Sequence, residues 1–389
     1  MSDFTAELPA SMGYRMPAEW EPHEATWLSW PRREGISFPD AYDEVMPVFV
    51  QMVDVLRGSE KVRINVADHD HEHGIRFILK DIDISHVEFF QIPTNEPWCR
   101  DHGPIFIVRE KEPRAAVVDW DYNAWGGKYP PYDLDEVVPT KVAEQLKLPV
   151  YYPKLILEGG SVDVNGAGAL LTTTSCLLNP NRNANRSQAE IEQALRDYLG
   201  VRQIIWLGDG IEGDDTDGHI DDITRFVAPN VVVTALEKDP KDSNYEPLQK
   251  NLELLQAVRL ADGSALEIIP LPMPPRIERE ARRLPASYAN FYIANKVVLL
   301  PVFGTPTDRK AGSILKKCLP GRKIVPIDCR ALVWGLGAFH CLTQQQPALG
   351  APGAPAAPIT PVTPVTPVTP ITPVTPGAPG APGAVSRER

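Results

Sequence analysis

Residues 213–225 gather carboxylates around a single histidine, His219, with Gly218 beside it. Like charges at this spacing repel one another and aspartates favour turns over regular helix, so the cluster predicts a bound cation. An imidazole flanked by carboxylates is also a positioned acid or base. An acidic, solvated loop is the alternative interpretation. The carboxylates concerned are Asp214, Asp215, Asp217, Asp221 and Asp222.

A second candidate lies in residues 95–104, directly before an apolar segment expected to be a strand. Trp98 offers an aromatic face and Asp101 a carboxylate, and together these groups bind a cation through cation–π attraction and charge pairing. Loops at strand ends commonly carry binding sites. Alternatively, Asp101 pairs with Arg100 or caps a turn.

Two further positions offer a carboxylate at the end of an expected strand and a candidate nucleophile. Glu158 follows the apolar residues 155–157, expected to be a strand, and precedes two glycines that permit close backbone approach. Cys341 follows a glycine-rich segment and, with a histidine available elsewhere, is a candidate thiol nucleophile. An inert buried thiol is the alternative for Cys341.

The alternating run at residues 68–73 contains His69, His71 and His73, which are potential metal ligands. No distant set of ligands is spaced to complete a coordination shell, so a polar turn or helix start is the favoured interpretation. His23, in the Trp- and Pro-rich residues 16–31, is expected to be a structural histidine in a packed loop.

Composition narrows the class of protein. The chain has 389 residues and a formal net charge of −12, which argues against nucleic-acid or anionic-membrane binding and favours small cationic ligands. No apolar run is long enough to span a bilayer and the N-terminus lacks a signal segment, so a cytosolic location is expected. The five cysteines contain no CxxC pair and are expected to be free thiols.

The hydrophobic pattern predicts repeated strand–strand–helix–strand units and therefore an α/β or α+β architecture with internal repeats. A capping box formed by Ser187 and Glu190 predicts a helix that Gly200 ends. Strands are expected at residues 62–66, 87–91, 105–108, 115–120, 170–178, 203–207, 226–234, 266–271, 291–302 and 323–327, and further helices at 41–56, 135–146, 246–260 and 308–318. From residue 348 onward the composition changes to Ala-Pro-Gly and Pro-Val-Thr units, which predict an extended or disordered tail.

Taken together, these segments resemble the agmatine deiminase and Porphyromonas-type peptidylarginine deiminase family of guanidino-group modifying enzymes. The resemblance covers residues 16–347 and is carried by residues 16–23, 98–104, 158–161, 178–183, 217–221 and 340–345 in that order. It implies a five-bladed, pseudo-symmetric α/β propeller of ββαβ repeats around a central channel. One catalytic domain, residues 1–347, would precede a disordered tail, residues 348–389.

The resemblance also implies roles for individual residues. Cys341 would be the nucleophile, His219 the general acid and base, and Glu158 its partner. Asp101 and Asp221 would bind the guanidinium, Trp98 would line the pocket, and Asp215 would lie near the distal amine of the substrate. No metal or organic cofactor is implied. The chain departs from the family pattern at Leu336, which interrupts a run of glycines, and within residues 213–217.

The expected activity is hydrolysis of agmatine to N-carbamoylputrescine and ammonia through a covalent thiouronium intermediate. A deiminase of free or peptidyl arginine is the alternative within this class, and an amidinotransferase would share the covalent intermediate. A non-catalytic module that binds cationic ligands is the alternative from another class, and a metallohydrolase using the residue 68–73 histidines is a further one. The expected partner is a small cationic guanidino compound. A homo-oligomer is compatible with the resemblance.

Overall fold

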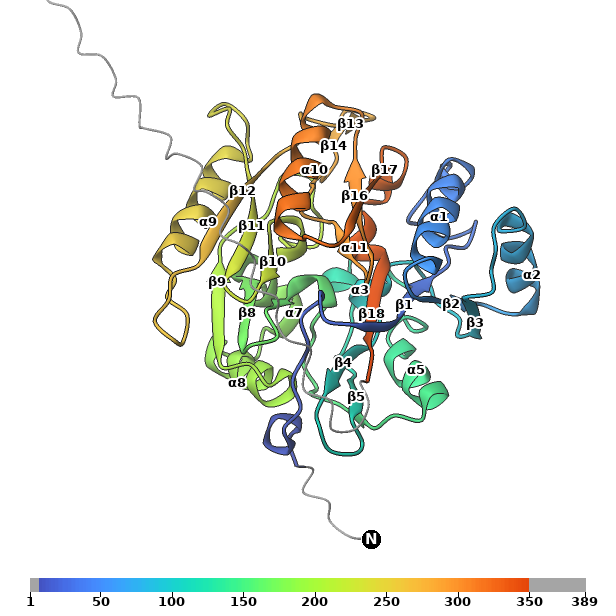
Figure 1. The fold of residues 1–389 in the computed structure, drawn as a ribbon, viewed down its shortest axis with the longest axis horizontal. Helices are drawn as coiled ribbons and strands as arrows, with labels where there is room; N and C mark the ends of the chain where they lie inside the picture. The colour runs from blue at the N-terminus through green and yellow to red at the C-terminus, as the bar shows by residue number, and fades with distance from the viewer. Residues whose placement is uncertain (1–6, 350–389) are drawn as a thin grey trace, which may run out of the picture.

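The computed structural model describes residues 7–349, which form a mixed α/β fold of several small sheets (Figure 1). Of the tail predicted from residue 348, everything from residue 350 onward lies outside the described residues. Within the described range, no helix is long and apolar enough to cross a membrane.

Five of the sheets share one plan, in which two antiparallel strands are followed by a third strand parallel to the second. Four of them contain β4 (Ile105–Val108), β5 (Ala115–Val118) and β6 (Val150–Tyr151); β7 (Asp163–Val164), β8 (Ala169–Thr173) and β9 (Gln203–Leu207); β10 (Thr224–Ala228), β11 (Val231–Leu236) and β12 (Glu267–Pro272); and β15 (Tyr292–Ile293), β16 (Val297–Val302) and β17 (Lys323–Asp328). The fifth contains β18 (Thr343–Pro347), β1 (His23–Ser29), β2 (Lys61–Val66) and β3 (Val87–Gln91).

A helix connects the two parallel strands in each of these sheets, because a parallel pair requires a crossover connection. These helices are α5 (Val138–Leu146), α8 (Gln188–Leu199), α9 (Tyr245–Ala257), α10 (Pro306–Cys318) and α1 (Tyr42–Arg57). A further helix, α2 (His69–Ile78), joins β2 to β3, and a separate hairpin consists of β13 (Glu278–Arg279) and β14 (Arg282–Arg283). The predicted strand–strand–helix–strand units are confirmed.

The predicted helix signals act locally as expected. The capping box of α8 is complete, since Ser187 accepts from the N–H of Glu190 while the Glu190 side chain accepts from the N–H of Ser187, and Gly200 ends the helix with a φ of 66°. In α1, the apolar residues at helical spacing are buried against the sheets.

Five sequence-based assignments are wrong for local reasons. The strand expected at 226–234 is the hairpin β10–β11, and the one expected at 291–302 is the hairpin β15–β16. The strand expected at 170–178 stops at Thr173, whose side chain caps α6 (Thr174–Leu177) by accepting from the N–H of Cys176. Residues 155–157 form no strand beyond a single bridge at Ile156. The packed loop at 16–31 contains β1, which is buried on both faces and therefore lacks polar alternation.

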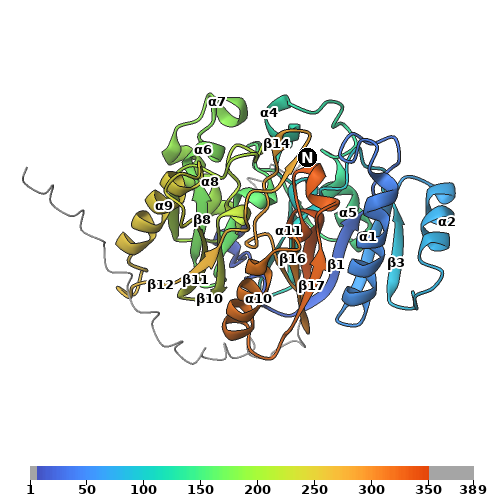
Figure 2. The same cartoon turned by 90° about the horizontal axis from the view of Figure 1, so that it is seen from above.

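The first and last described strands are neighbours. β18 pairs antiparallel with β1, so the segment that carries Cys341 lies against the N-terminal residues (Figure 1). In both views the short helix α11 (Phe339–Leu342) lies between α9 on one side and α1 on the other (Figure 2).

The segments that precede the first strand of each of the five sheets carry the candidate site. Single-turn helices precede four of these strands: α3 (Cys99–His102), η2 (Gly159–Ser161), η3 (Ile220–Asp222) and α11, before β4, β7, β10 and β18 respectively. Asn290 precedes the remaining first strand, β15. Equivalent positions in a repeated unit therefore supply the polar side chains that meet in the interior.

Candidate active site

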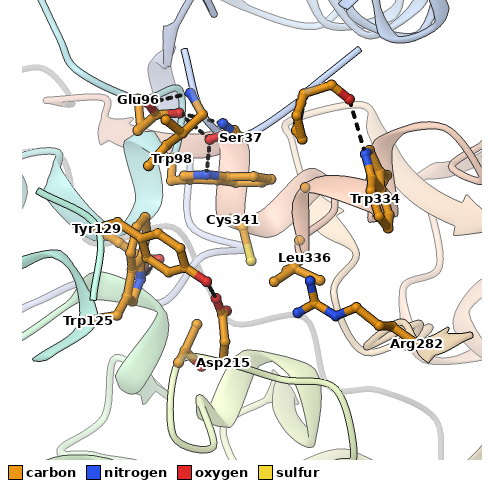
Figure 3. Close-up of a pocket in the computed structure, with 16 residues that line it drawn as sticks. Ser37, Glu96, Trp98, Trp125, Tyr129, Asp215, Arg282, Trp334, Leu336 and Cys341 are labelled. Atoms are coloured by element: carbon orange, nitrogen blue, oxygen red, sulfur yellow. Dashed lines mark hydrogen bonds between the residues drawn. The ribbon is translucent and has the colours of Figure 1, made fainter. Parts of the chain in front are cut away.

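A cavity of about 160 Å³ opens above Cys341 (Figure 3). Its walls are mostly aromatic and acidic, with one arginine and a glycine-containing segment around Leu336. The lining residues used below are Trp98, Asp101, Trp125, Tyr129, Asp215, Arg282, Trp334, Gly335, Leu336, Gly337 and Cys341. Trp98 is 5% exposed and its indole N–H donates to Ser37 Oγ at 2.8 Å, which fixes one wall.

Cys341 is only 4% exposed and is held by Asn290. The Asn290 side chain donates to Cys341 Sγ at 3.0 Å and accepts from the backbone N–H of His340 at 3.1 Å. Burial raises the pKa of the Cys341 thiol well above its ordinary value, and the carboxylates of Asp221, Asp222 and Asp101 raise it further. In the ligand-free site the sulfur is therefore a protonated thiol.

His219 is fully buried and lies between two carboxylates. Its Nδ1 is 3.6 Å from Asp101 Oδ1 and its Nε2 is 3.9 Å from Glu158 Oε2. Burial lowers the pKa of His219, but the charge of Asp101 and the contacts with Cys176 and Glu158 outweigh it, so the pKa is well above its ordinary value. Neither ring nitrogen has a hydrogen-bond partner within residues 7–349, so the hydrogen-bonding capacity of the imidazole is unused there.

Glu158 is anchored behind His219. Arg182 donates from Nε to Glu158 Oε1 at 2.6 Å, and both side chains are fully buried. Burial raises the pKa of Glu158, but His219 and Arg182 outweigh this effect and hold the pKa below its ordinary value. Glu158 therefore remains a carboxylate that stabilises the protonated form of the neighbouring imidazole.

Asp101 is fixed through both oxygens. Its Oδ1 accepts from the N–H of Gly160 at 2.9 Å and its Oδ2 accepts from the Trp125 indole at 2.9 Å. Burial raises the pKa of Asp101, and the nearby charge of Asp221 adds to this. A cation bound between these two carboxylates would stabilise both as anions.

Asp221 keeps one acceptor free. Its Oδ2 lies 2.6 Å from His340 Nδ1, whereas the buried Oδ1 has no hydrogen-bond partner in the described part of the chain. Burial raises the pKa of Asp221, but His340 outweighs it and holds the pKa below its ordinary value. The sulfur of Cys341 is 3.6 Å from Asp221 Oδ2, so the free carboxylate acceptor and the thiol share one site.

Gly160 explains the pair of glycines after Glu158. A Cβ at this position would lie 2.6 Å from His219 Nδ1, 2.7 Å from Asp101 Oδ1 and 3.0 Å from Asp221 Oδ2. Side chains at position 160 are thus excluded by the residues that converge there, and the glycine lets its N–H reach Asp101.

The cation predicted among the aspartates of residues 213–225 comes partly from the protein itself. Asp217 accepts from Arg182 Nη1 and from Lys128 Nζ, each at 2.8 Å. Asp214 accepts from the backbone N–H groups of Gly218 at 3.0 Å and His219 at 3.2 Å. Asp217 is therefore paired with cations of the protein itself and Asp214 is hydrogen-bonded by backbone groups, whereas a bound cation at the remaining carboxylates stays a prediction.

Asp215 lies at the far wall of the cavity and is half-buried. Its carboxylate accepts from the hydroxyl of Tyr129, and its backbone carbonyl accepts from Lys128 Nζ. Burial raises the pKa of Asp215. Of the seven sequence-predicted residues, the structure thus places Trp98, Asp101, Asp215 and Cys341 in the wall of one cavity, and Glu158, His219 and Asp221 are buried behind it.

Sequence reasoning missed the residues that hold this floor together. His340 bridges Asp221 and Glu19, whose Oε2 lies 2.8 Å from His340 Nε2. Glu19 in turn pairs with Arg225 at 2.9 Å. Glu19 lies within residues 16–23 and His340 within residues 340–345, two segments that carry the resemblance. The resemblance implies no role for either residue. Asn290 and Trp125 carried no comparable signal in the sequence.

Two predictions concern histidines away from the site: His23 as a structural residue, and the histidines of residues 68–73 as potential metal ligands. His23 is buried between Glu60 and the carbonyl of Glu19 and does not line the cavity, as expected for a structural residue. His69 and His71 lie in the first turn of α2, and the one group of three potential metal-ligand residues found in residues 7–349 is instead Glu158, Cys176 and His219. All five cysteines are free.

Comparison with known proteins agrees with this geometry. The family model for Porphyromonas-type peptidyl-arginine deiminases matches residues 15–347. A Legionella pneumophila (strain Paris) protein, provisionally named an agmatine deiminase, is 38% identical over 340 residues, which are 87% of this chain and 97% of the relative. The agmatine deiminase of Medicago truncatula is 37% identical over 373 residues, covering 88% of this chain and 98% of its own.

A solved structure supports the same relationship. The agmatine deiminase of Enterococcus faecalis has a TM-score of 0.82 to this chain at 31% identity, and the match covers 89% of this chain and 99% of that one. The residues that the family model matches, 15–347, contain every residue of the cavity floor. This chain therefore belongs to the Porphyromonas-type peptidyl-arginine deiminase family.

Proposed function

We propose that this protein hydrolyses the guanidino group of agmatine to give N-carbamoylputrescine and ammonia. The observation that carries the proposal is the thiol of Cys341, which lines the cavity together with Asp101 and lies 3.6 Å from Asp221, a buried carboxylate whose Oδ1 has no hydrogen-bond partner in the described residues. Relatives at 37–38% identity that bear the name agmatine deiminase support the choice of substrate.

Recognition of the guanidinium follows from its chemistry. A guanidinium stays charged at working pH and presents its N–H donors in a planar fork, so it is bound by carboxylates that accept from more than one side. Asp101 and Asp221 meet this requirement, and Trp98 offers a flat face beside them. The bound cation also offsets the carboxylate charges that raise the pKa of Cys341, and so favours the thiolate.

The first step transfers the carbon to sulfur. The Cys341 thiolate attacks the guanidinium carbon and forms a C–S bond, which gives a neutral tetrahedral adduct. The imidazolium of His219 donates its proton to one amino group, and ammonia departs with the electron pair of the broken C–N bond. The product of this step is a covalent thiouronium cation, and Glu158 keeps the imidazole oriented throughout.

The second step uses water. Neutral His219 accepts a proton from a water molecule as its oxygen attacks the thiouronium carbon, and the C–S bond then breaks to release the thiolate. The product then loses its hydroxyl proton to solvent, where the ammonia released in the first step takes up a proton, so the balance is guanidinium and water to a urea-type product and ammonium.

The distal end of the cavity supports a substrate with a second positive charge. Asp215 is half-buried and its carboxylate is hydrogen-bonded by Tyr129, so it offers an oriented anion to an ammonium group. Agmatine carries such a group at the end of its butyl chain. The remaining aromatic wall, which includes Trp125 and Trp334, suits the methylene chain between the two charges.

We also propose that the five sheets are the blades of a pseudo-fivefold propeller and that residues 1–347 form one catalytic domain. The common strand plan of the sheets and the equivalent positions of α3, η2, η3, Asn290 and α11 support this arrangement. In a propeller these positions would all face the central channel, which accounts for a site assembled from segments far apart in the sequence.

The test is ammonia release from purified protein supplied separately with agmatine, L-arginine and an N-blocked arginine peptide, without any added amine acceptor. Agmatine should release ammonia and give an equal amount of N-carbamoylputrescine, because water is the acceptor in the second step. Turnover that depends on an added amine would identify an amidinotransferase instead. Failure to release ammonia from all three compounds would overturn the proposal.

A further inference from the structure

Leu336 adopts a backbone conformation that disfavours a leucine, at the wall of the cavity. Its φ of 69° and ψ of 20° lie in the left-handed region, and its N–H donates to the carbonyl of Val333 at 2.9 Å to end η4 (Leu332–Gly335). A side chain in this region clashes with the neighbouring carbonyl, so it persists only where its surroundings enforce it. Trp125, on the opposite wall, has a φ of 56°.

The residues on either side of Leu336 cannot carry side chains. A Cβ at position 335 would lie 2.5 Å from Phe38 Cε1 and 2.9 Å from Trp98 Cζ2, and one at position 337 would lie 2.6 Å from Trp98 Cζ3. The segment therefore lies directly on Trp98. Leu336 is the one member of these three residues whose side chain enters the cavity.

The Leu336 side chain lies between the reacting sulfur and the cationic part of the distal end. Figure 3 shows it beside Cys341 and next to the guanidinium of Arg282. Arg282 is an exposed residue of β14 that lines the cavity, and its side chain has no hydrogen-bond or ion-pair partner among the described residues, although its charge acts on the nearby Tyr129. Asp215 lies across the cavity from Leu336. The distal end thus combines an anion, an unpaired cation and an apolar side chain that separates this cation from Cys341.

We infer that Leu336 restricts the substrates to unbranched guanidinoalkylamines by excluding a carboxyl group on the carbon that bears the distal amine. The inference rests on the proposed function, because it requires a guanidinium at Cys341 and an amine at Asp215. Agmatine has only hydrogens on that carbon, whereas arginine has a carboxylate. Against the isobutyl group of Leu336 this carboxylate would be desolvated without a partner, because Leu336 lies next to the guanidinium of Arg282 and occupies space that the carboxylate would need to pair with it.

Removing the side chain should therefore change selectivity in a defined direction. Leu336→Ala and Leu336→Gly both open the space, and the carboxylate of arginine then reaches the guanidinium of Arg282. We expect the ratio of kcat/KM for L-arginine to that for agmatine to increase at least tenfold in both variants. Adding Arg282→Gln to Leu336→Ala should remove most of this increase, whereas arginine amide, which lacks the carboxylate, should gain less than arginine.

Two controls distinguish the effect of opening space in the cavity from the effect of relieving backbone strain at position 336. Glycine relieves the left-handed conformation and alanine does not, so only Leu336→Gly should raise the melting temperature, while both should change selectivity. Lys147→Gly is the matched control, because Lys147 is an exposed residue with a φ of 55° at the end of α5, outside the residues that line the cavity. Lys147→Gly should leave the ratio of kcat/KM for L-arginine to that for agmatine unchanged. An unchanged ratio in folded Leu336→Ala and Leu336→Gly would overturn the inference.

The inference and the proposed function fail in different ways. If wild-type protein does not turn over agmatine, the proposed function is wrong. The dissociation constants of agmatine and arginine, measured by calorimetry in the Cys341→Ala background with and without Leu336→Ala, then decide the role of Leu336. A tenfold shift of this binding ratio towards arginine would support it, and no shift would refute it.

Discussion

The side chains at the two ends of the cavity differ in how deeply they are buried and in how many contacts fix them. At the reactive end, Cys341, Asp101 and His219 are at most 5% exposed, and Asn290, Gly160 and Trp125 fix the first two of them. At the distal end, Asp215 and Leu336 are half-buried, and Arg282 is exposed with no partner in the described structure. Side chains with few fixed contacts adjust at low cost, whereas buried networks do not.

This contrast separates two functions within one cavity. Substitutions at the reactive end should lower kcat, because they remove groups needed in the transition state. Substitutions at the distal end should mainly change KM or the choice of substrate, because they remove binding that ground state and transition state share. The predictions below test that division.

Cys341→Ala should show the largest effect. The variant lacks the nucleophile, so agmatine turnover should fall by roughly 10⁴-fold or more, which is the scale seen when a covalent catalyst loses its attacking group. Because the side chain is small and the substitution keeps most of its volume, the melting temperature should change little. Steady-state ammonia release and a calorimetric melting curve provide the two measurements. Residual activity within tenfold of wild type would place the nucleophile elsewhere.

His340→Gln tests whether the support beneath the reactive end matters for chemistry. His340 contacts Asp221 and Glu19 through its two ring nitrogens, and glutamine cannot reproduce both contacts from one position. With Asp221 less firmly oriented, kcat should fall by roughly 100-fold, the usual effect of losing one oriented polar partner of a reacting group. KM for agmatine should change less than kcat.

His23→Gln is the matched control for this prediction. His23 is also buried and also contacts a carboxylate, with Nδ1 2.9 Å from Glu60 Oε1, but it does not line the cavity. Both variants should lose stability, and only His340→Gln should lose kcat. Equal losses of kcat in the two variants would show that His340 acts on the fold alone.

The pH dependence should reflect the raised pKa values at the reactive end. Because burial and three carboxylates raise the pKa of Cys341, the thiolate fraction of the free protein is small at neutral pH and increases as pH rises. Alkylation of Cys341 by iodoacetamide, followed by mass spectrometry, should thus still accelerate above pH ~8.5, the ordinary thiol value. The raised pKa of His219 preserves the imidazolium to higher pH, so the optimum of kcat/KM should be alkaline. An alkylation rate that levels off below pH 7 would contradict the raised thiol pKa.

The sequence predicts those residues of the cavity whose type alone indicates their chemistry. It does not predict contacts between residues that lie far apart in the chain. His219, Glu158 and Cys341 have residue types that do chemistry wherever they are placed, so motif reasoning finds them. The partner of His340, Glu19, is 321 positions away, and neither residue has a type or spacing that reveals the contact. The same limit explains the aspartates of residues 213–225, whose neutralising Arg182 and Lys128 lie on other segments.

The fold shows the same limit at shorter range. Strand and helix types follow from the hydrophobic pattern that each unit repeats, but that pattern does not show the turns within 226–234 and 291–302. Pro229 and Asn230 lie between β10 and β11, and both are turn-forming residues that signal the first of these turns. The conformation of Leu336 has no such signal, because nothing in its residue type predicts a left-handed backbone.

Asp215→Asn should show the smallest effect and sharpens the contrast most directly. Asparagine keeps an acceptor for the Tyr129 hydroxyl but removes the charge that would bind the distal ammonium. Since the residue is half-buried, the lost charge pair should raise KM for agmatine by roughly tenfold, or about 1.4 kcal/mol, and leave kcat within a factor of three. Asp214→Asn serves as the control, because Asp214 binds backbone N–H groups of Gly218 and His219 and would disturb the reactive end instead. If Asp215→Asn lowered kcat and left KM unchanged, the acid at the far wall would belong to the chemistry and the division between the two ends would be wrong.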